Sequence, residues 1–291
     1  MTQSQGYLED INQLKASTIL NLENLLAFSQ QIIESTRFKH YMKAKSLIRY
    51  NTFSALYQRA DSVLALTRIN QGNAANVIVR SMWETLIEYD FINLLPSNTN
   101  LEIRLASESK QQLTILTDIQ EIRAKYPYAE TWQNEISDEA VSKSIERRRS
   151  ELLKFNRKYP NVNLKKYSTL HARLKEVDAS VLAKNPRHRD LAQFDYRGFY
   201  PLLSMDAHST VIGNAHNSRM HKNSRLEIRL EAPLYESVRT AQLAYTLFLK
   251  FLIEINKRQK LHAGRKLKEF KTIDKKHVAD YAGLQKKYRF Y

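Results

Sequence analysis

Two stretches of the sequence place groups capable of acid–base and anion chemistry among apolar residues. In VRSMWETLIEYD, Arg80 and Glu84 are four residues apart and therefore lie on one face of a helix. In YPLLSMDAHSTVIGNAH, Ser204 and His208 share a helix face in the same way. A histidine transfers protons near neutral pH, and an arginine binds a phosphate or carboxylate through paired hydrogen bonds. We therefore predict four candidate catalytic residues: Arg80, Glu84, Ser204 and His208.

Residues around His208 have side chains that suit contact with an anion. Tyr200 lies two turns before His208 in the expected helix, and His216 falls within about 80° of it around the helix axis. The tract HNSRMHKN adds an arginine and a histidine where this helix is expected to end. We predict these as binding residues: Tyr200, His216, Arg219 and His221.

Each of these groups also has a structural interpretation. Arg80 and Glu84 can form an ion pair that only supports packing, although the Arg-then-Glu order is the weaker one on a surface helix. Ser204 and His208 can be hydrogen-bonded core residues, since no glycine-rich nucleophile turn accompanies them. The sequence has no H-E-x-x-H motif and no pair of E-x-x-H motifs, so we predict no metal site. It has no glycine-rich phosphate loop either, and nothing identifies a cofactor.

The elements that must position these residues are long helices. Gly and Pro number six each in 291 residues, too few for many tight turns. Apolar residues recur at steps of three and four, and no run alternates as a strand would. The predicted helices cover residues 7–35, 38–70, 74–95, 100–125, 137–158, 166–183, 200–217 and 233–258. The predicted fold is all-α, a bundle of long antiparallel helices with a basic, less regular insertion.

We predict four segments along the chain. Residues 1–127 form the N-terminal helices of the bundle, 128–196 the basic insertion, 197–258 the C-terminal helices of the same bundle, and 259–291 a basic tail. In the tail, KRQKLHAGRKLKEFKTIDKKH is expected to be partly disordered, whereas YAGLQKKYRFY is aromatic enough to dock on the bundle.

The net charge of +16 is concentrated in two segments. Residues 143–190 hold 14 Lys/Arg and five Asp/Glu, and residues 256–291 hold 12 and three, so each segment carries +9. A concentrated basic field attracts polyanions through counterion release, although a merely solvated basic surface is the alternative. We predict nucleic acid as the partner, RNA rather than DNA. The sequence is compatible with a homodimer.

Other features exclude some classes of protein. The chain has no cysteine, which excludes disulfides, thiolate metal ligands and a cysteine nucleophile. Its first residues lack the pattern of a signal peptide. The most apolar window, AQLAYTLFLKFLIEI, is short for a bilayer span and contains Lys250. We therefore expect a cytoplasmic protein without a membrane segment.

The pattern Arg80-x-x-x-Glu84 together with Tyr200-x-x-Leu203-Ser204-x-x-x-His208 resembles a bacterial helical family, the domain of unknown function numbered 5677. The likeness covers roughly residues 45–255. It implies an all-helical domain whose polar positions match these residues, and it does not supply an established reaction.

The chain also has a looser resemblance to the HEPN class of helical ribonucleases and nucleotide-binding proteins of toxin and antiphage systems. The catalytic signature of that class is an arginine followed by a histidine after four to six intervening residues. The matching positions before His208 are Pro201, Leu202 and Leu203. The resemblance therefore does not supply a HEPN ribonuclease site.

Two functions follow from these patterns. The first is a nucleic-acid-binding, nuclease-like effector of a bacterial defence or toxin system that acts on RNA. In this function His208 serves as general acid/base, Arg80 binds a phosphate and Glu84 orients a partner. The second is a non-enzymatic helical binding or regulatory module whose polar cluster is structural and whose basic tail binds nucleic acid or an acidic protein. A small-molecule enzyme ranks third, and whether the protein is an enzyme stays open. The first function requires Arg80 and His208 to lie side by side.

Overall fold

Nearly all residues that the computed structural model describes lie in helices, which confirms the all-α prediction. The structure describes residues 3–34, 44–95, 97–126, 137–184, 218–220, 226–228 and 234–288. The helices are α1 (Gln3–Glu34), α2 (Ala44–Arg68), α3 (Gly72–Ile92), α4 (Thr99–Lys125), α6 (Asp138–Lys158), α7 (Leu170–Lys184), α11 (Leu234–Gln259) and α12 (Gly264–Tyr288), with a 3₁₀ turn, η1 (Leu164–Tyr167). Two short strands, β1 (Ser218–Met220) and β2 (Leu226–Ile228), pair antiparallel. The predicted helix at 200–217 lies outside the described residues.

The chain divides into two compact units, residues 1–89 with 190–291 (unit 1) and residues 90–189 (unit 2). Unit 1 contains α1, α2, most of α3, α11 and α12, and unit 2 contains α4, α6, η1 and α7. The sequence grouped the helix at 100–125 with the helices before it, whereas α4 packs with α6 in unit 2. The segment boundaries at 127, 196 and 258 stay predictions.

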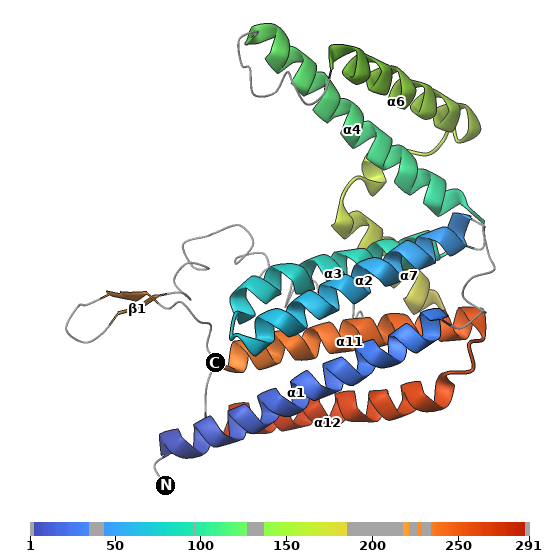
Figure 1. Cartoon of the computed structure of the whole chain (residues 1–291). Helices are drawn as coiled ribbons and strands as arrows, with labels where there is room; N and C mark the ends of the chain where they lie inside the picture. The colour runs from blue at the N-terminus through green and yellow to red at the C-terminus, as the bar shows by residue number, and fades with distance from the viewer. Residues whose placement is uncertain are drawn as a thin grey trace. The chain divides into compact units, whose positions relative to one another are not determined.

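The core of unit 1 forms around α11, which packs against α1, α2 and α12 (Figure 1). It can contact several helices because apolar residues cover most of its circumference, unlike the single stripe of a surface helix. Its fully buried aromatic residues include Phe248 and Phe251. The ring of Phe248 lies 5.8 Å from that of Phe53 in α2, and the ring of Phe251 lies 5.0 Å from that of Tyr89 in α3, both edge to face. These aromatic contacts hold α2 and α3 against α11.

The start of α3 lies directly against the start of α11. A Cβ atom on Gly72 would come within 2.7 Å of the backbone nitrogen of Ser237, so this approach requires a residue without a side chain. One turn further, the buried hydroxyl of Thr240 donates a hydrogen bond to Asn76 Oδ1 at 2.7 Å. These contacts fix the axial position of α3, and hence of the polar residues one and two turns beyond Asn76.

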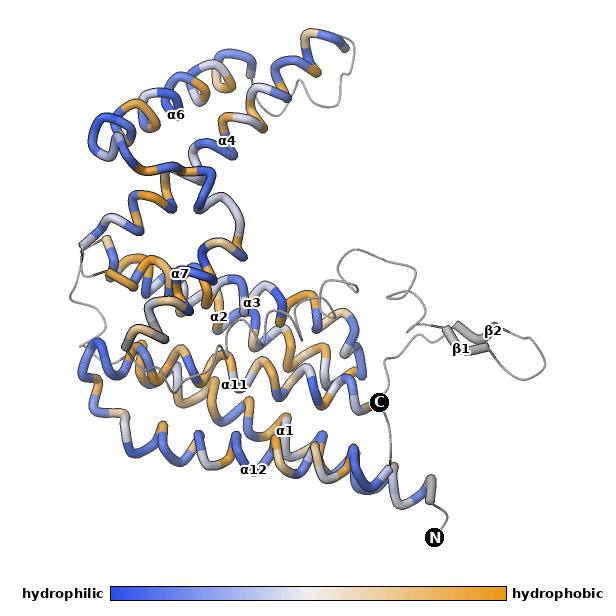
Figure 2. The backbone as a smooth tube through the Cα atoms, turned by 180° about the vertical axis from the view of Figure 1, so that it is seen from behind, coloured by the Kyte–Doolittle hydropathy of each residue, from blue (hydrophilic) through white to orange (hydrophobic). Residues whose placement is uncertain are grey.

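The segment expected to be partly disordered forms an ordered helix instead, so that prediction is wrong. Helix α12 packs on α1 and α11, with Leu267 and Phe270 each 3 % exposed. Its apolar residues form a narrow stripe, and many lysines lie between them in the sequence. Helix α12 is therefore mainly hydrophilic along its length (Figure 2). The expected docking of the aromatic end is confirmed for its described part, residues 281–288, because Tyr281 and Leu284 pack against an apolar cluster of α1 and α11.

In unit 2, α4 and α6 pack against each other along their length (Figure 1). Helix α6 begins at a side-chain cap, where Ser137 Oγ accepts a hydrogen bond from the Ala140 backbone at 3.2 Å. The side chain of Asn100 in α4 donates to the carbonyl of Phe91 at 2.7 Å, and the Phe91 ring lies 5.8 Å from that of Tyr167 in η1. The last residues of α3 are thereby tied to α4 and η1.

Candidate functional site

The predicted polar residues of α3 lie beside its core-facing stripe. Val79, Met82 and Leu86 are buried, and Arg80 and Glu84 occupy the adjacent, half-buried face. Arg80 Nε donates to Glu84 Oε1 at 2.9 Å, with the two side chains 18 % and 35 % exposed. The structure therefore shows the shared face that the spacing indicates, and the two groups form an ion pair within one helix.

A residue that the sequence did not indicate, Arg59 of α2, joins this group. Its guanidinium donates to the Ser81 carbonyl at 3.3 Å and to the Thr85 hydroxyl. Burial lowers the pKa of Arg59, and the nearby Glu84 carboxylate acts in the opposite direction. The Glu84 carboxylate thus lies near two guanidinium groups, those of Arg80 and Arg59. The same contacts join α2 to α3, which is a structural role.

Most of the second half of the predicted site lies outside the described residues: Tyr200, Ser204, His208, His216 and His221. Arg219 lies in strand β1, opposite Glu227 of β2. The proximity of Arg80 to His208, on which the catalytic hypothesis depends, therefore stays a prediction.

The solvent side of α12 presents a row of lysines, which we name the α12 lysine stripe: Lys268, Lys271, Lys275 and Lys286. All four are exposed, and at 100° per residue they fall within an arc of about 60°. Within the described part of the chain, none of these four ammonium groups forms an ion pair or a hydrogen bond, whereas Lys266 and Lys287 of the same helix pair with Glu269 and Asp10. The stripe is therefore a group of four cations without an ion-pair partner among the described residues.

The opposite side of α12 is fixed to α1 by a buried histidine. His277 is 6 % exposed, with Nδ1 3.1 Å from Thr18 Oγ1 and Nε2 2.8 Å from Asn21 Nδ2. The Thr18 hydroxyl donates its single proton to the Leu14 carbonyl at 2.7 Å, so it accepts from Nδ1–H, while the Asn21 amide donates to Nε2. This network requires the neutral imidazole, and burial lowers the pKa of His277 accordingly.

A carboxyl group fixes the same helix to α11. Asp274 Oδ1 accepts hydrogen bonds from Gln242 Nε2 at 2.7 Å and from Thr246 Oγ1 at 2.6 Å. Burial raises the pKa of Asp274, and these two hydrogen bonds act in the opposite direction. Together with His277, this carboxyl sets the rotation of α12, and therefore the side on which its lysines are exposed.

The other basic segment, at 143–190, is partly neutralised, as is 256–291, where Arg258, Arg265, Lys266 and Lys287 form ion pairs. Five of its basic side chains form ion pairs with glutamates of unit 2: Lys143, Arg147, Arg148, Lys158 and Lys166. Exposed pairs of this kind contribute little to stability, but each removes a charge from the field that a polyanion would meet. Among the described residues of the two segments, those of α12 form the larger unpaired group of cations on one helix face.

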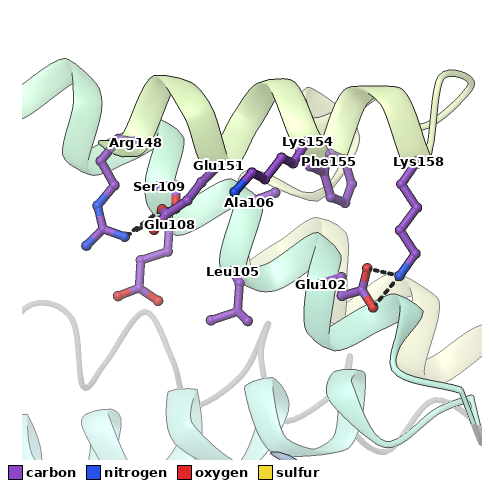
Figure 3. A pocket seen from close by; sticks show the side chains of 10 residues that line it. All are labelled: Glu102, Leu105, Ala106, Glu108, Ser109, Arg148, Glu151, Lys154, Phe155 and Lys158. Carbon is purple, nitrogen blue, oxygen red and sulfur yellow. Dashed lines mark hydrogen bonds and ion pairs between the residues drawn. The ribbon is translucent and has the colours of Figure 1, made fainter. Parts of the chain in front are cut away.

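A groove of about 440 Å³ lies between α4 and α6 (Figure 3). At one end Lys158 Nζ donates to both oxygens of Glu102, at 2.8 and 2.7 Å. At the other, Glu151 accepts hydrogen bonds from Arg148 and Ser109, each at 2.8 Å, and the Arg148 contact lowers the pKa of Glu151. These contacts hold α6 on the face of α4 that carries Glu102 and Ser109.

Two features are absent from the described residues. Across the described residues, no group of three or more His, Cys, Asp or Glu side chains could hold a metal ion. None of the described helices combines the length and the apolar character that crossing a membrane requires.

The model of a family of unknown function (DUF5677) matches residues 45–225, which ends before the expected limit of 255. The match includes Arg80, Glu84, Tyr200, Ser204 and His208, and it excludes α12. No curated protein and no solved structure matches the chain.

Proposed function

This chain belongs to the family of unknown function DUF5677, and we propose that it binds nucleic acid through the α12 lysine stripe. The observation that carries the proposal is the set of four exposed, unpaired lysines on one side of an ordered helix. A polyanion that meets these lysines releases condensed counterions, and that release supplies most of sequence-independent binding to nucleic acid.

The charge of the whole helix supports the proposal. Residues 264–288 contain eight Lys/Arg and three Asp/Glu, which gives a net charge of +5. Because Phe270 and His277 are buried on the far side of the helix, α12 cannot turn its lysines inward without exposing apolar surface. A preorganised cationic face loses less conformational freedom on binding than a disordered tail would.

A nuclease-like step at Arg80, Glu84, Ser204 and His208 is not part of this proposal and stays a prediction. The non-enzymatic alternative, in which the polar cluster of α3 is structural, is supported by the contacts of Arg59 with Ser81 and Thr85. Both alternatives are compatible with nucleic-acid binding by α12.

The test is binding of a fluorescein-labelled single-stranded RNA, measured by anisotropy, to the full chain and to two charge-matched variants. The first variant replaces the four lysines of the stripe by glutamine. The control replaces four exposed lysines of unit 2 that form no ion pair within the described residues, Lys110, Lys154, Lys165 and Lys175. Both variants lose the same net charge.

We expect the stripe variant to bind RNA at least about tenfold more weakly than the wild type at moderate salt. The control variant should stay within about twofold of the wild type. Equal losses in both variants would mean that net charge alone attracts RNA. Undiminished binding by the stripe variant, or no binding by the wild type, would also overturn the proposal. A labelled DNA duplex measured in parallel tests the preference for RNA.

A further inference from the structure

Helix α4 has two distinct faces, of which α6 covers one. The contacts with α6 come from Glu102, Ser109 and Arg123, which bond to Lys158, Glu151 and Asp138. These α4 residues are spaced by seven and fourteen, and so they define one side of the helix. A second face, about 100° away around the helix axis, carries three apolar residues of α4, and the C-cap residue follows them; we name these four the α4 apolar stripe: Ile115, Ile119, Ile122 and Tyr126.

The stripe is unusual because its members are both apolar and largely exposed. Ile115, Ile122 and Tyr126 are 57 %, 59 % and 55 % exposed, and Ile119 is half-buried. Single exposed apolar residues are ordinary on a protein surface. Four of them at steps of four, three and four form the seam that a helix presents to another helix in a coiled coil.

The charges beside the stripe indicate which helix packs against it. Asp118 and Lys125 each directly precede a stripe residue, on the side of the stripe away from α6. Neither forms an ion pair within the described part of the chain. When two copies of the same helix run antiparallel about a twofold axis, two opposite charges that lie seven residues apart on one edge form two ion pairs. In each pair the acidic residue belongs to one copy and the basic residue to the other.

We propose that the α4 apolar stripe is a self-association surface that pairs antiparallel with the same stripe of a second copy of this chain. Ile119 packs opposite Ile122 of the second copy, and Ile115 opposite Tyr126 of the second copy. In this register Asp118 of each copy faces Lys125 of the other. All four layers of the seam are then apolar, and both flanking contacts are attractive.

The length of the stripe sets the strength of this association. Four residues on each side bury less area than the roughly 1,200 Å² of a stable complex. We therefore expect a dimer that forms reversibly and whose population rises with protein concentration. The stripe belongs to unit 2 and α12 to unit 1, so different variants test the proposed dimer and the proposed binding of nucleic acid.

The test uses charge reversals that only this pairing makes complementary. Asp118→Lys places lysines opposite each other twice, and Lys125→Asp does the same with aspartates. We expect each variant alone to associate at least about tenfold more weakly than the wild type in sedimentation equilibrium. An equimolar mixture of the two variants should restore the dimer, because each copy then meets the opposite charge.

Two further variants test the apolar part of the surface. Ile122→Glu should remove the dimer, whereas Leu153→Glu, at a similarly exposed residue of α6 (58 %), should leave it intact. Circular dichroism checks that each variant keeps its helicity. A wild-type chain that stays monomeric at the highest attainable concentration would overturn the proposal. So would a mixture of the two charge variants that associates no better than either alone, because another register or another surface would then be responsible.

Discussion

The attachment of α12 to α1 through His277 should make the folded state sensitive to mild acid. The hydrogen bonds to Thr18 and Asn21 require a neutral ring, and burial lowers the pKa of His277 below its value in the unfolded chain. Between those two pKa values the unfolded state binds one more proton than the folded state. Stability therefore rises with pH in that window, and the contribution of His277 is lost as the pH falls from about 6.5 towards the lower, folded-state value.

The size of this loss of stability follows from the one extra proton that the unfolded state binds. One pH unit below the unfolded-state pKa of about 6.5, the loss is at most about 1.4 kcal/mol. The groups around the ring are Asp280 and Asp274, which raise its pKa, and Lys276, which lowers it. Burial raises the pKa of Asp274, so this carboxyl titrates with the opposite sign and stabilises the fold as the pH falls.

The assay is urea unfolding, followed by circular dichroism, of the wild type and of His277→Gln at pH values of about 7.5 and 5.5. Glutamine can donate to Thr18 and accept from Asn21 but does not titrate, so subtraction isolates the imidazole. Acidification should reduce the free energy of unfolding of the wild type by up to about 1.4 kcal/mol more than that of the variant. Parallel pH dependences of the two proteins would refute the neutral-histidine account.

Three further results are expected. Gly72→Ala should lower the urea midpoint, because the new Cβ would lie 2.7 Å from the Ser237 nitrogen and force α3 away from α11. The expected cost is about 1–3 kcal/mol. An unchanged midpoint would show that the two helices can move apart without loss of stability. Phe248→Ala removes a fully buried ring and should lower the free energy of unfolding by about 3–5 kcal/mol in the same assay. A loss below about 1 kcal/mol would contradict the position of Phe248 in the core of unit 1. If the catalytic prediction is right, His208→Ala should abolish RNA cleavage in a gel assay while helicity is retained, and unchanged cleavage would remove His208 from that role.

The sequence was sufficient for the elements with a strong helical period. Helices α3 and α11 lie within three residues of their predicted limits because each has regularly spaced apolar residues and a clear stop signal. Helix α12 was missed for the opposite reason. Its apolar residues are few, and the lysines between them give the composition of a solvated tail, so only packing against α1 and α11 shows it to be a helix.

The candidate sites show the same limit. Helical spacing was enough to place Arg80 and Glu84 on one face, because that relation is local. Arg59 could not have been found in this way, since it reaches Ser81 and Thr85 from another helix more than twenty positions earlier. Nothing in the sequence distinguishes Arg59 from the two other arginines of the predicted second helix, Arg49 and Arg68. The grouping of α4 with α6 depends likewise on contacts between separate helices, such as that between Glu102 and Lys158.

The salt dependence of RNA affinity tests the central proposal most directly, because its slope counts the phosphate contacts that the α12 lysine stripe makes. For single-stranded nucleic acid each contact contributes about 0.7 to the slope of log affinity against log salt, so four lysines contribute about 2.8. We expect the stripe variant to give a slope shallower by about that amount than both the wild type and the unit 2 control. Parallel lines for all three proteins would contradict the proposal that α12 binds nucleic acid.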